Sequence, residues 1–385
     1  MVKVKVLNNI SSLGLDKFSK DIYEVSTEDN NPDAILVRSA KMHDLEVGEN
    51  LKAVGRAGAG VNNIPLEKLS NKGVVVFNTP GANANAVKEL VISSMLLASR
   101  NICQAWSYVN SLPLDNLKST VEDGKKQYSG SELPGKTLGI VGLGAIGVEI
   151  ANAASTLGMD VIGFDPSITK KNAWKISSEV EEVSSIEELF KRSDFVSFHV
   201  PLIDATKNLL NANCIALLPE NSVVINLSRD GIVDEDTLIK ALDSGKVKYY
   251  VTDFPINDKK NHDRVIALPH LGASTSEAEE NCAVMIAKQI KDYLENGNIV
   301  NSVNFPDAKM PRAGKERLAI THRNIPNMVG QISTAVAKEG ANILDMINKS
   351  RNDFAYTLID LENKISNTVI EDIKLVEGIL KVRVL

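Results

Sequence analysis

Short apolar runs separated by polar stretches dominate the first 80 residues of the chain. Each run is four to six residues long, the usual length of a buried strand. The intervening stretches are long enough for helices, so the pattern predicts a small open α/β domain. The expected strands are residues 2–7, 34–37, 51–56 and 74–78.

A second series of apolar runs begins near residue 136 and predicts a doubly wound parallel sheet. Its expected strands are residues 136–141, 160–164, 195–199, 222–227, 247–251 and 265–268. A polar segment, residues 110–132, leads into this series.

Two long helices are expected to flank the second series. Apolar positions recur at helical spacing from Ala84 to Arg100, and Ser276-x-x-Glu279 reads as a capping box opening a helix that ends at Asn296. The second domain, residues 91–270, is therefore expected to be inserted into the first, residues 1–90 and 271–305. The two helices would form the hinge, with a small substrate in the cleft between the domains.

Residues 301–316 are rich in Asn, Pro, Lys, Gly and Arg, which is typical of a linker. After them the chain begins a new series of strand and helix patterns. Strand and helix patterns follow in the order βαββαβ, which predicts a ferredoxin-like module. We call residues 312–385 the C-terminal module. It shows no catalytic constellation, which favours a regulatory or assembly role.

The sequence around Gly142-x-Gly144-x-x-Gly147 indicates a dinucleotide-binding unit. An apolar strand precedes these glycines, a helical stretch follows them, and a second strand ends on Asp165. The glycines permit a tight turn and close approach of the backbone to a pyrophosphate, and the helix N-terminus supplies N–H groups and a positive dipole. A carboxylate at Asp165 would accept from the ribose hydroxyls and repel a 2′-phosphate, so NAD is favoured over NADP.

The net charge, the cysteines and the length of the apolar runs argue against several classes of function. A net charge of −6 without long basic runs argues against nucleic acid and anionic membranes as partners. The three cysteines are far apart, no metal-ligand cluster is evident, and no apolar run reaches 18 residues. We therefore expect a cytoplasmic protein with reduced thiols and no metal.

Two polar segments follow strands of the second series, where ligands sit in such sheets. One contains Arg229 and the other His270. Removing a hydride from a secondary alcohol requires a base for the hydroxyl proton and a cation for the neighbouring carboxylate. His270 is the candidate base and Arg229 the candidate clamp.

The whole array resembles the D-2-hydroxyacid dehydrogenases, most closely the branch that oxidises D-3-phosphoglycerate. The resemblance covers nearly the whole chain and rests on residues 55–64, 78–81, 88–90, 199–202, 227–231 and 269–275. It implies a Rossmann-type cofactor domain inserted in a flavodoxin-like substrate domain, with Arg229 as clamp and His270 as acid/base. The cofactor residues that it implies, beside the three glycines, are Ala145, Ile146, Asp165, His199, Val200, Pro201, Leu227, Ser228, Arg229, Asp253, His270, Gly272 and Ala273.

The third catalytic residue of the family is an acid five positions after the Asp near the nicotinamide. Counting from Asp253 reaches Asp258, whereas alignment on the Phe-Pro pair places Asn257 there. We prefer Asp258, since an Asn could orient the imidazole of His270 but could not raise its pKa.

A phosphorylated substrate needs additional cations. Arg38 and Arg56 lie at expected strand ends of the first domain, and Ser39, Ala57 and Gly58 join them as expected substrate contacts. They favour 3-phosphoglycerate, oxidised to 3-phosphohydroxypyruvate in the first step of L-serine biosynthesis. The alternatives are a hydroxypyruvate or glyoxylate reductase and a non-catalytic protein that senses NAD.

The C-terminal module resembles an ACT domain, a fold that often binds amino acids at a dimer interface. In serine-regulated relatives the effector contacts correspond to His322, Asn324 and Asn342. Asn327 stands where the family has Gly, and a side chain there could obstruct a ligand. L-serine is therefore one expected effector, a purely assembling module is the alternative, and a homodimer or homotetramer is expected.

Overall fold

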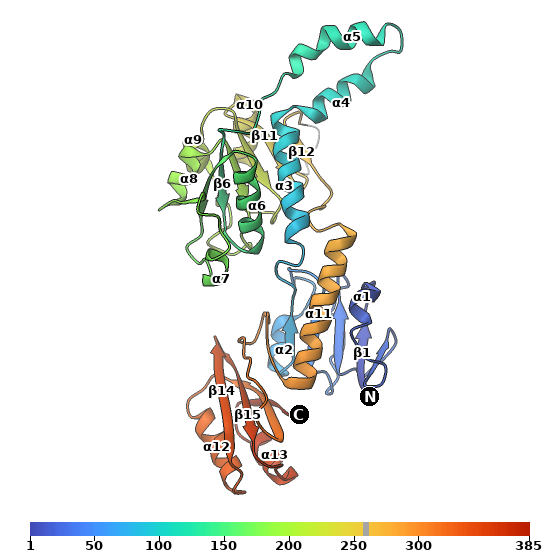
Figure 1. The fold of residues 1–385 in the computed structure, drawn as a ribbon, viewed down its shortest axis with the longest axis vertical. Coiled ribbons are helices and arrows are strands. Elements are labelled where there is room, and N and C mark those ends of the chain that lie inside the picture. Colours follow the sequence, from blue (N-terminus) through green and yellow to red (C-terminus); the bar gives the residue numbers. More distant parts are fainter. Residues whose placement is uncertain (257–261) are drawn as a thin grey trace. The chain divides into compact units, whose positions relative to one another are not determined.

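The computed structural model describes residues 1–256 and 262–385. The chain divides into two compact units, one of residues 1–82 and 279–385 and the other of residues 83–278 (Figure 1). The divisions therefore fall eight residues from the boundaries expected at 90/91 and 270/271. The C-terminal module shares a unit with the N-terminal residues.

The first part of unit 1 is a parallel sheet with the order β2-β1-β3-β4-β5, the flavodoxin-like order expected from the sequence. The four expected strands are present, and Tyr23–Ser26 is an additional edge strand that the apolar pattern missed. The strands are β1 (Val2–Val6), β2 (Tyr23–Ser26), β3 (Ala34–Val37), β4 (Ala53–Arg56) and β5 (Val75–Phe77), and the short helices are α1 (Ser12–Leu15) and α2 (Leu66–Asn71).

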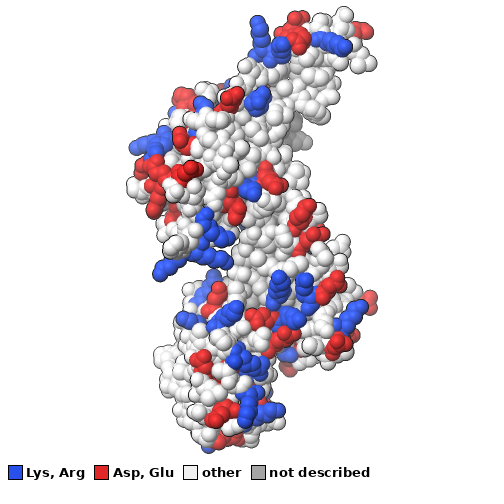
Figure 2. All heavy atoms as spheres, in the orientation of Figure 1, with Lys and Arg blue, Asp and Glu red and all other residues white. Residues whose placement is uncertain are grey.

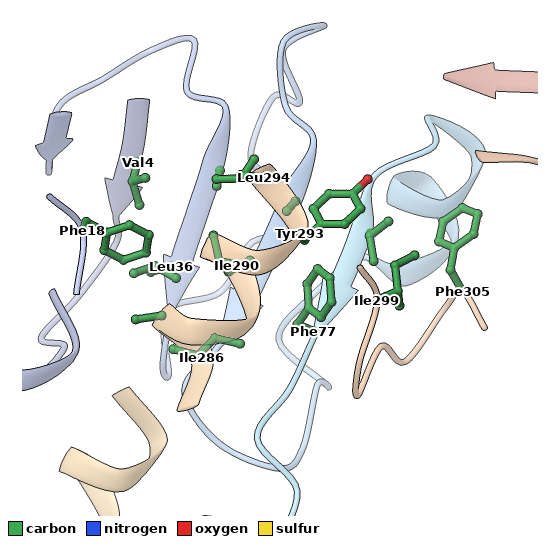
Figure 3. Packing of buried hydrophobic residues seen from close by; sticks show 14 of the residues in the cluster. Val4, Phe18, Leu36, Phe77, Ile286, Ile290, Tyr293, Leu294, Ile299 and Phe305 are labelled. Atoms are coloured by element: carbon green, nitrogen blue, oxygen red, sulfur yellow. The ribbon is translucent and has the colours of Figure 1, made fainter. Parts of the chain in front are cut away.

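One face of this sheet is covered by the long helix α11 (Ser276–Asn296). Figure 3 shows Ile286, Ile290 and Tyr293 of α11 packed toward Leu36 and Phe77 of the strands. Each of these side chains is at most 1% exposed, and a fully buried side chain of this size contributes about 1.5–3 kcal/mol. The helix begins where the sequence predicted, but its cap is Thr275, whose Oγ1 accepts from the N–H of Ala278, so the expected capping box is wrong.

Unit 2 is a parallel sheet with the order β12-β11-β10-β9-β6-β7-β8, the doubly wound order. Helices cover both faces, α3 and α6 on one and α8, α9 and α10 on the other (Figure 1). The strands are β6 (Thr137–Val141), β7 (Asp160–Phe164), β8 (Glu181–Glu182), β9 (Phe195–Phe198), β10 (Ser222–Asn226), β11 (Val247–Thr252) and β12 (Val265–Ala267). The helices are α3 (Ala84–Ser99), α4 (Ile102–Ser111), α5 (Leu117–Gly124), η1 (Lys125–Tyr128), α6 (Ala145–Thr156), α7 (Lys170–Ala173), α8 (Ile186–Arg192), α9 (Ala212–Leu217) and α10 (Glu235–Ser244).

The polar segment at 110–132 contains helical structure that its composition did not reveal. It holds α5 and η1, and neither α4 nor α5 has a buried residue. These helices form an arm of unit 2 (Figure 1).

The C-terminal module has the expected βαββαβ order and an antiparallel sheet ordered β14-β15-β13-β16. Its elements are β13 (Glu316–Arg323), α12 (Met328–Ala337), β14 (Ile343–Arg351), β15 (Phe354–Leu361), α13 (Asn367–Lys374) and β16 (Ile379–Val384). The segment expected as a linker has no helix or strand up to residue 315, but it is packed, because Phe305, Ala308 and Met310 are buried. Ile299 and Ala308 exchange backbone hydrogen bonds of 2.8 and 3.0 Å, which folds the segment onto the domain.

Side chains of the C-terminal module cap the end of α11. Arg383 donates to the carbonyls of Tyr293 and Leu294, and Arg317 donates to that of Asn296. The hydroxyl of Tyr356 donates to the carbonyl of Gly297 over 2.6 Å. The last carbonyls of a helix have no partners within it, so the module satisfies acceptors that would otherwise be buried and unpaired.

A buried ion pair joins two strands of the module at this junction. Arg317 and Asp360 are both 0% exposed and meet at 2.5 Å (Nε to Oδ1) and 2.7 Å (Nη2 to Oδ2). Removing one member of such a pair leaves the other charge buried without compensation.

Replacing Asp360 with Asn should lower the free energy of unfolding by about 3–5 kcal/mol, because the guanidinium of Arg317 keeps its charge and loses its carboxylate. Urea unfolding monitored by circular dichroism measures this. Asp353→Asn, at an exposed carboxylate in the turn before β15, is the matched control and should be nearly neutral. Equal unfolding midpoints for the two variants would show that the buried pair does not hold the module together.

Candidate active site

The turn between β6 and α6 depends on glycine for two separate reasons. Gly142 has a left-handed φ of 94°, and a Cβ on Gly147 would lie 2.0 Å from the carbonyl oxygen of Gly142. A Cβ on Gly144 would instead point into space where none of the described residues comes within 4 Å. That space adjoins the start of α6 at Ala145 and Ile146, whose N–H groups and helix dipole suit a pyrophosphate.

Asp165 follows β7 and is fixed by two backbone donors. Its Oδ2 accepts from the N–H of Leu143 over 2.9 Å, and its Oδ1 accepts from the N–H of Ser167 over 2.8 Å. Each oxygen keeps a lone pair for a further donor, such as a ribose hydroxyl. The carboxylate therefore stabilises the glycine turn, and it also lies where the ribose hydroxyls of a dinucleotide need an acceptor.

The loop after β9 borders the same turn. The carbonyl oxygen of His199 and a methyl group of Val200 lie 2.6 and 2.8 Å from the position of a Cβ on Gly142. The imidazole Nε2 of His199 lies 2.8 Å from the Ser197 hydroxyl, and burial lowers the pKa of His199 to about 3. His199 is therefore neutral at physiological pH and brings no charge to the site, and Pro201 continues its loop.

Asn226 organises the loop that carries Arg229. This amide is 1% exposed at the end of β10; its Nδ2 donates to the carbonyl of Arg229 and its Oδ1 accepts from the N–H of Ser228. The guanidinium of Arg229 is half-buried and donates one N–H to the carbonyl of Ser228. Five guanidinium donors leave capacity to bind a carboxylate.

Asp253 holds the loop that carries His270. The carboxylate, 1% exposed at the end of β11, accepts from the N–H of Leu271 over 3.0 Å and from that of Gly272 over 2.8 Å. His270 is exposed and adopts a left-handed φ of 57°, and its imidazole packs edge-to-face with the Phe254 ring, the two ring centres lying 5.2 Å apart. A strained backbone conformation held by a buried carboxylate points to a functional residue.

These loops come together at one edge of the sheet. The N–H of Asp253 donates to the carbonyl of Asn226, and a Cβ on Gly272 would lie 3.8 Å from the carbonyl oxygen of Leu227. Ala273 follows in the same turn, where the N–H of Ser274 donates to the carbonyl of Leu271. Unit 2 thus brings the expected base and the expected clamp onto neighbouring loops.

Unit 1 itself carries a cluster of two arginines. Arg38 donates from Nη2 to Glu279 Oε1 over 2.5 Å, and Arg56 donates from Nε to the carbonyl of Arg38 over 3.1 Å. A Cβ on Gly58 would lie 1.9 Å from the guanidinium of Arg56, so glycine makes room for this side chain. Ser39 accepts from the amide of Asn8, and Ala57 is buried.

The third catalytic position cannot be placed, because Asn257 and Asp258 lie outside the described residues. Within residues 1–256 and 262–385, no group of His, Cys, Asp and Glu could hold a metal ion. In the same residues, no helix is long and apolar enough to cross a membrane. Basic and acidic side chains are interspersed on the face in Figure 2.

The expected effector residues of the C-terminal module do not share one surface. The imidazole of His322 is 1% exposed within the sheet, 2.9 Å from the Thr357 hydroxyl, and burial lowers its pKa. The amide of Asn324 donates to the carbonyl of Asn352, and that of Asn342 donates to Glu362. Asn327 has a left-handed φ of 63°, which explains how Asn replaces Gly there.

Three further residues hold or contact expected site residues but were not predicted to do so: Asn226 and Phe254 in unit 2, and Glu279 in unit 1. Asn226 and Phe254 each follow the buried apolar positions of a strand, and a polar or aromatic residue at that place is a usable signal. Glu279 was interpreted as part of a helix cap and instead binds Arg38.

Comparisons with known proteins identify the family of this chain. Residues 92–272 match the family described as D-isomer specific 2-hydroxyacid dehydrogenase, NAD binding domain. The D-3-phosphoglycerate dehydrogenase of Haemophilus influenzae is 34% identical over 356 residues, which are 89% of this chain and 83% of that protein. That of Methanocaldococcus jannaschii is 37% identical over 82% of this chain, but only 59% of its own length is spanned.

A solved structure supports the same assignment. The NAD+-bound 3-phosphoglycerate dehydrogenase of Entamoeba histolytica is 30% identical, has a TM-score of 0.64, and is matched over 79% of this chain and 98% of its own. The chain therefore belongs to the D-2-hydroxyacid dehydrogenase family, and residues 92–272 match that family's NAD-binding domain.

Proposed function

We propose that this protein oxidises D-3-phosphoglycerate to 3-phosphohydroxypyruvate with NAD. The observation that carries the proposal is the placement of Arg229 and His270 on neighbouring loops held by the buried side chains of Asn226 and Asp253. The relatives from Haemophilus influenzae and Methanocaldococcus jannaschii carry the name of this activity. Solved D-lactate and D-2-hydroxyisocaproate dehydrogenases at 21–22% identity share only the fold, which does not choose the substrate.

In this proposal Arg229 and His270 act on two different groups of the substrate, its carboxylate and its hydroxyl. Arg229 binds the carboxylate and fixes the neighbouring carbon, while the imidazole of His270 accepts the hydroxyl proton. NAD, when bound, accepts the hydride from that carbon. Gly142, Gly144 and Gly147 make room for its pyrophosphate, and Asp165 accepts from its ribose. We assign the third catalytic position to Asp258, which would hold the protonated imidazole.

Arg38 and Arg56 are assigned to the substrate phosphate. Guanidinium groups bind phosphate oxygens through paired N–H donors. Glu279 occupies one nitrogen of Arg38 and leaves its other donors for a ligand.

Regulation and location stay predictions. Asn324 and Asn342 bond at opposite ends of β15, so they are candidate L-serine contacts only if they come from two copies of the C-terminal module, whereas His322 is committed to contacts inside it. A cytoplasmic location follows from the proposed place in serine synthesis.

We also propose that the protein is at least a homodimer formed through the arm of α4 and α5. Its exposed apolar side chains include Trp106, which is 70% exposed, and Leu114, which is 89% exposed. Helices with no buried residue gain little stability from burial in their own chain, so a partner surface would stabilise them.

The substrate assignment predicts a selective effect of Arg38→Gln. The variant should raise KM for D-3-phosphoglycerate at least about tenfold, because a charged hydrogen bond is lost, while KM for 2-hydroxyglutarate changes little. NADH formation monitored at both substrates measures this. Equal changes for the two substrates would remove Arg38 from the phosphate site, and no turnover of D-3-phosphoglycerate by the wild type would refute the proposed activity.

The cofactor assignment predicts that Asp165→Ala weakens NADH binding at least about tenfold, because the acceptor for the ribose hydroxyls is removed. The ratio of NADH affinity to NADPH affinity should also fall, because the negative charge that repels the 2′-phosphate is removed. Fluorescence titration with each nucleotide gives the affinities. Asp160→Asn, at an exposed carboxylate at the start of β7, is the control. An unchanged ratio of NADH to NADPH affinity would contradict the role of Asp165.

The assembly proposal predicts that Trp106→Ser with Leu114→Ser yields a monomer near the chain mass of 41.8 kDa, while the wild type has at least twice that mass. Light scattering after size exclusion provides the mass. Trp174→Ser removes a tryptophan that is even more exposed, at 89%, from another part of unit 2 and should leave the assembly intact. An intact assembly in the arm variant would place the interface elsewhere.

A further inference from the structure

A cavity of about 480 Å³ lies where the C-terminal module meets the first sheet of unit 1. Strand β16 and the end of α13 form one wall, and residues 49–52 form the other. Four cationic side chains line it together with one carboxylate: Lys52, Lys374, Lys381, Arg383 and Glu49. None of them takes part in the proposed reaction.

Lys381 is the central group of this cavity. Its Nζ donates to the carbonyl of Glu49 over 2.9 Å and to that of Leu51 over 2.6 Å. An ammonium has three protons, so these two bonds leave one donor. Among residues 1–256 and 262–385, no carboxylate forms an ion pair with Lys381.

Arg383 supplies a second positive charge. Within the described part of the chain, no carboxylate forms an ion pair with it. Its guanidinium lies 4.4 Å from the centre of the Tyr293 ring and donates to the carbonyls of Tyr293 and Leu294. Lys52 and Lys374, in contrast, pair with Asp33 at 2.5 Å and Glu371 at 2.8 Å, outside the cavity lining. Glu49 is the one carboxylate of the lining, so positive charge prevails there.

The electrostatics of Lys381 agree with this imbalance. Burial, followed by the charges of Lys52, Arg383 and Lys72, lowers its pKa to about 8, and only Glu49 acts in the opposite direction. Lys381 is partly buried, and an ammonium that is partly withdrawn from water beside other cations is destabilised unless an anion compensates for it. The cavity has the volume and donors for such an anion.

We propose that this cavity binds a small oxyanion with two or more negative charges, either free phosphate or a phosphate monoester, between Lys381, Lys374 and Lys52. The bound anion bridges β16 to residues 49–52. Because Arg383 on β16 also caps the end of α11, the anion strengthens the docking of the C-terminal module on the first domain. This site is separate from the proposed active site and does not depend on the proposed activity.

The test is a thermal-shift measurement on the full chain in phosphate, sulfate or glycerol phosphate against potassium chloride of equal ionic strength. At 10 mM anion we expect the unfolding midpoint to rise by about 2 °C in the wild type, since a ligand that binds only the folded state stabilises it. A larger shift with glycerol phosphate than with phosphate identifies a monoester as the ligand, and the reverse order identifies the free ion.

Variants locate the site. Lys381→Met should abolish the shift, and Lys374→Met, at a more exposed position, should reduce it at least about threefold even if the first variant folds poorly. Lys364→Met removes an exposed charge elsewhere on the module and should leave the shift unchanged. Arg38→Gln, which disables the proposed substrate site, should also retain it.

Calorimetric titration with sulfate adds a pH criterion, because sulfate keeps two charges from pH 7 to 9. The affinity should fall several-fold over this range as Lys381 loses its proton, and Lys381→Arg should remove that dependence. The charged groups that act on Lys381 are Lys52, Lys72, Arg383 and Glu49. A shift that persists in Lys381→Met, or the same stabilisation by chloride, would overturn the proposal.

Discussion

A buried carboxylate fixes the geometry on which the rest of the proposed site depends. Asp253 accepts two consecutive backbone N–H groups, from Leu271 and Gly272, and so determines the course of the loop directly after His270. The loop keeps His270 in a left-handed conformation that a flexible segment would not maintain. Asn226 does the same on the neighbouring strand for the turn before Arg229. The sheet supplies the positions, and these two buried side chains convert them into a defined arrangement of base and clamp.

Other polar side chains of the molecule also combine a structural role with a role at a ligand site. Asp165 braces the glycine turn through Leu143 and keeps lone pairs for a ribose, and Arg383 caps α11 while lining a basic cavity. Each of these side chains satisfies backbone groups that would otherwise be unpaired, and presents its remaining donors or acceptors to a ligand. The C-terminal module is consequently part of the packing of unit 1, since it supplies partners for the end of the helix that covers the first sheet.

The periodicity of apolar residues predicted the strands and helices better than it predicted the contacts between distant segments. Short apolar runs separated by helical stretches located most of the strands, and β3 (Ala34–Val37) and β7 (Asp160–Phe164) were placed to the residue. The pattern could not show that residues 301–316 pack into the core through Phe305, or that Glu279 pairs with Arg38 across 241 positions. Such contacts depend on how distant segments meet in space, which local hydrophobicity does not encode. Asp253 was expected beside the cofactor, but only the structure shows that its carboxylate binds the loop after His270.

The most direct measurement is the turnover of D-3-phosphoglycerate by Asp253→Asn. An amide offers one acceptor where the carboxylate offers two, so the loop after His270 should shift, and kcat should fall at least about a hundredfold in a protein that still folds and binds NADH. A value of kcat equal to that of the wild type would show that the buried carboxylate does not position the catalytic imidazole.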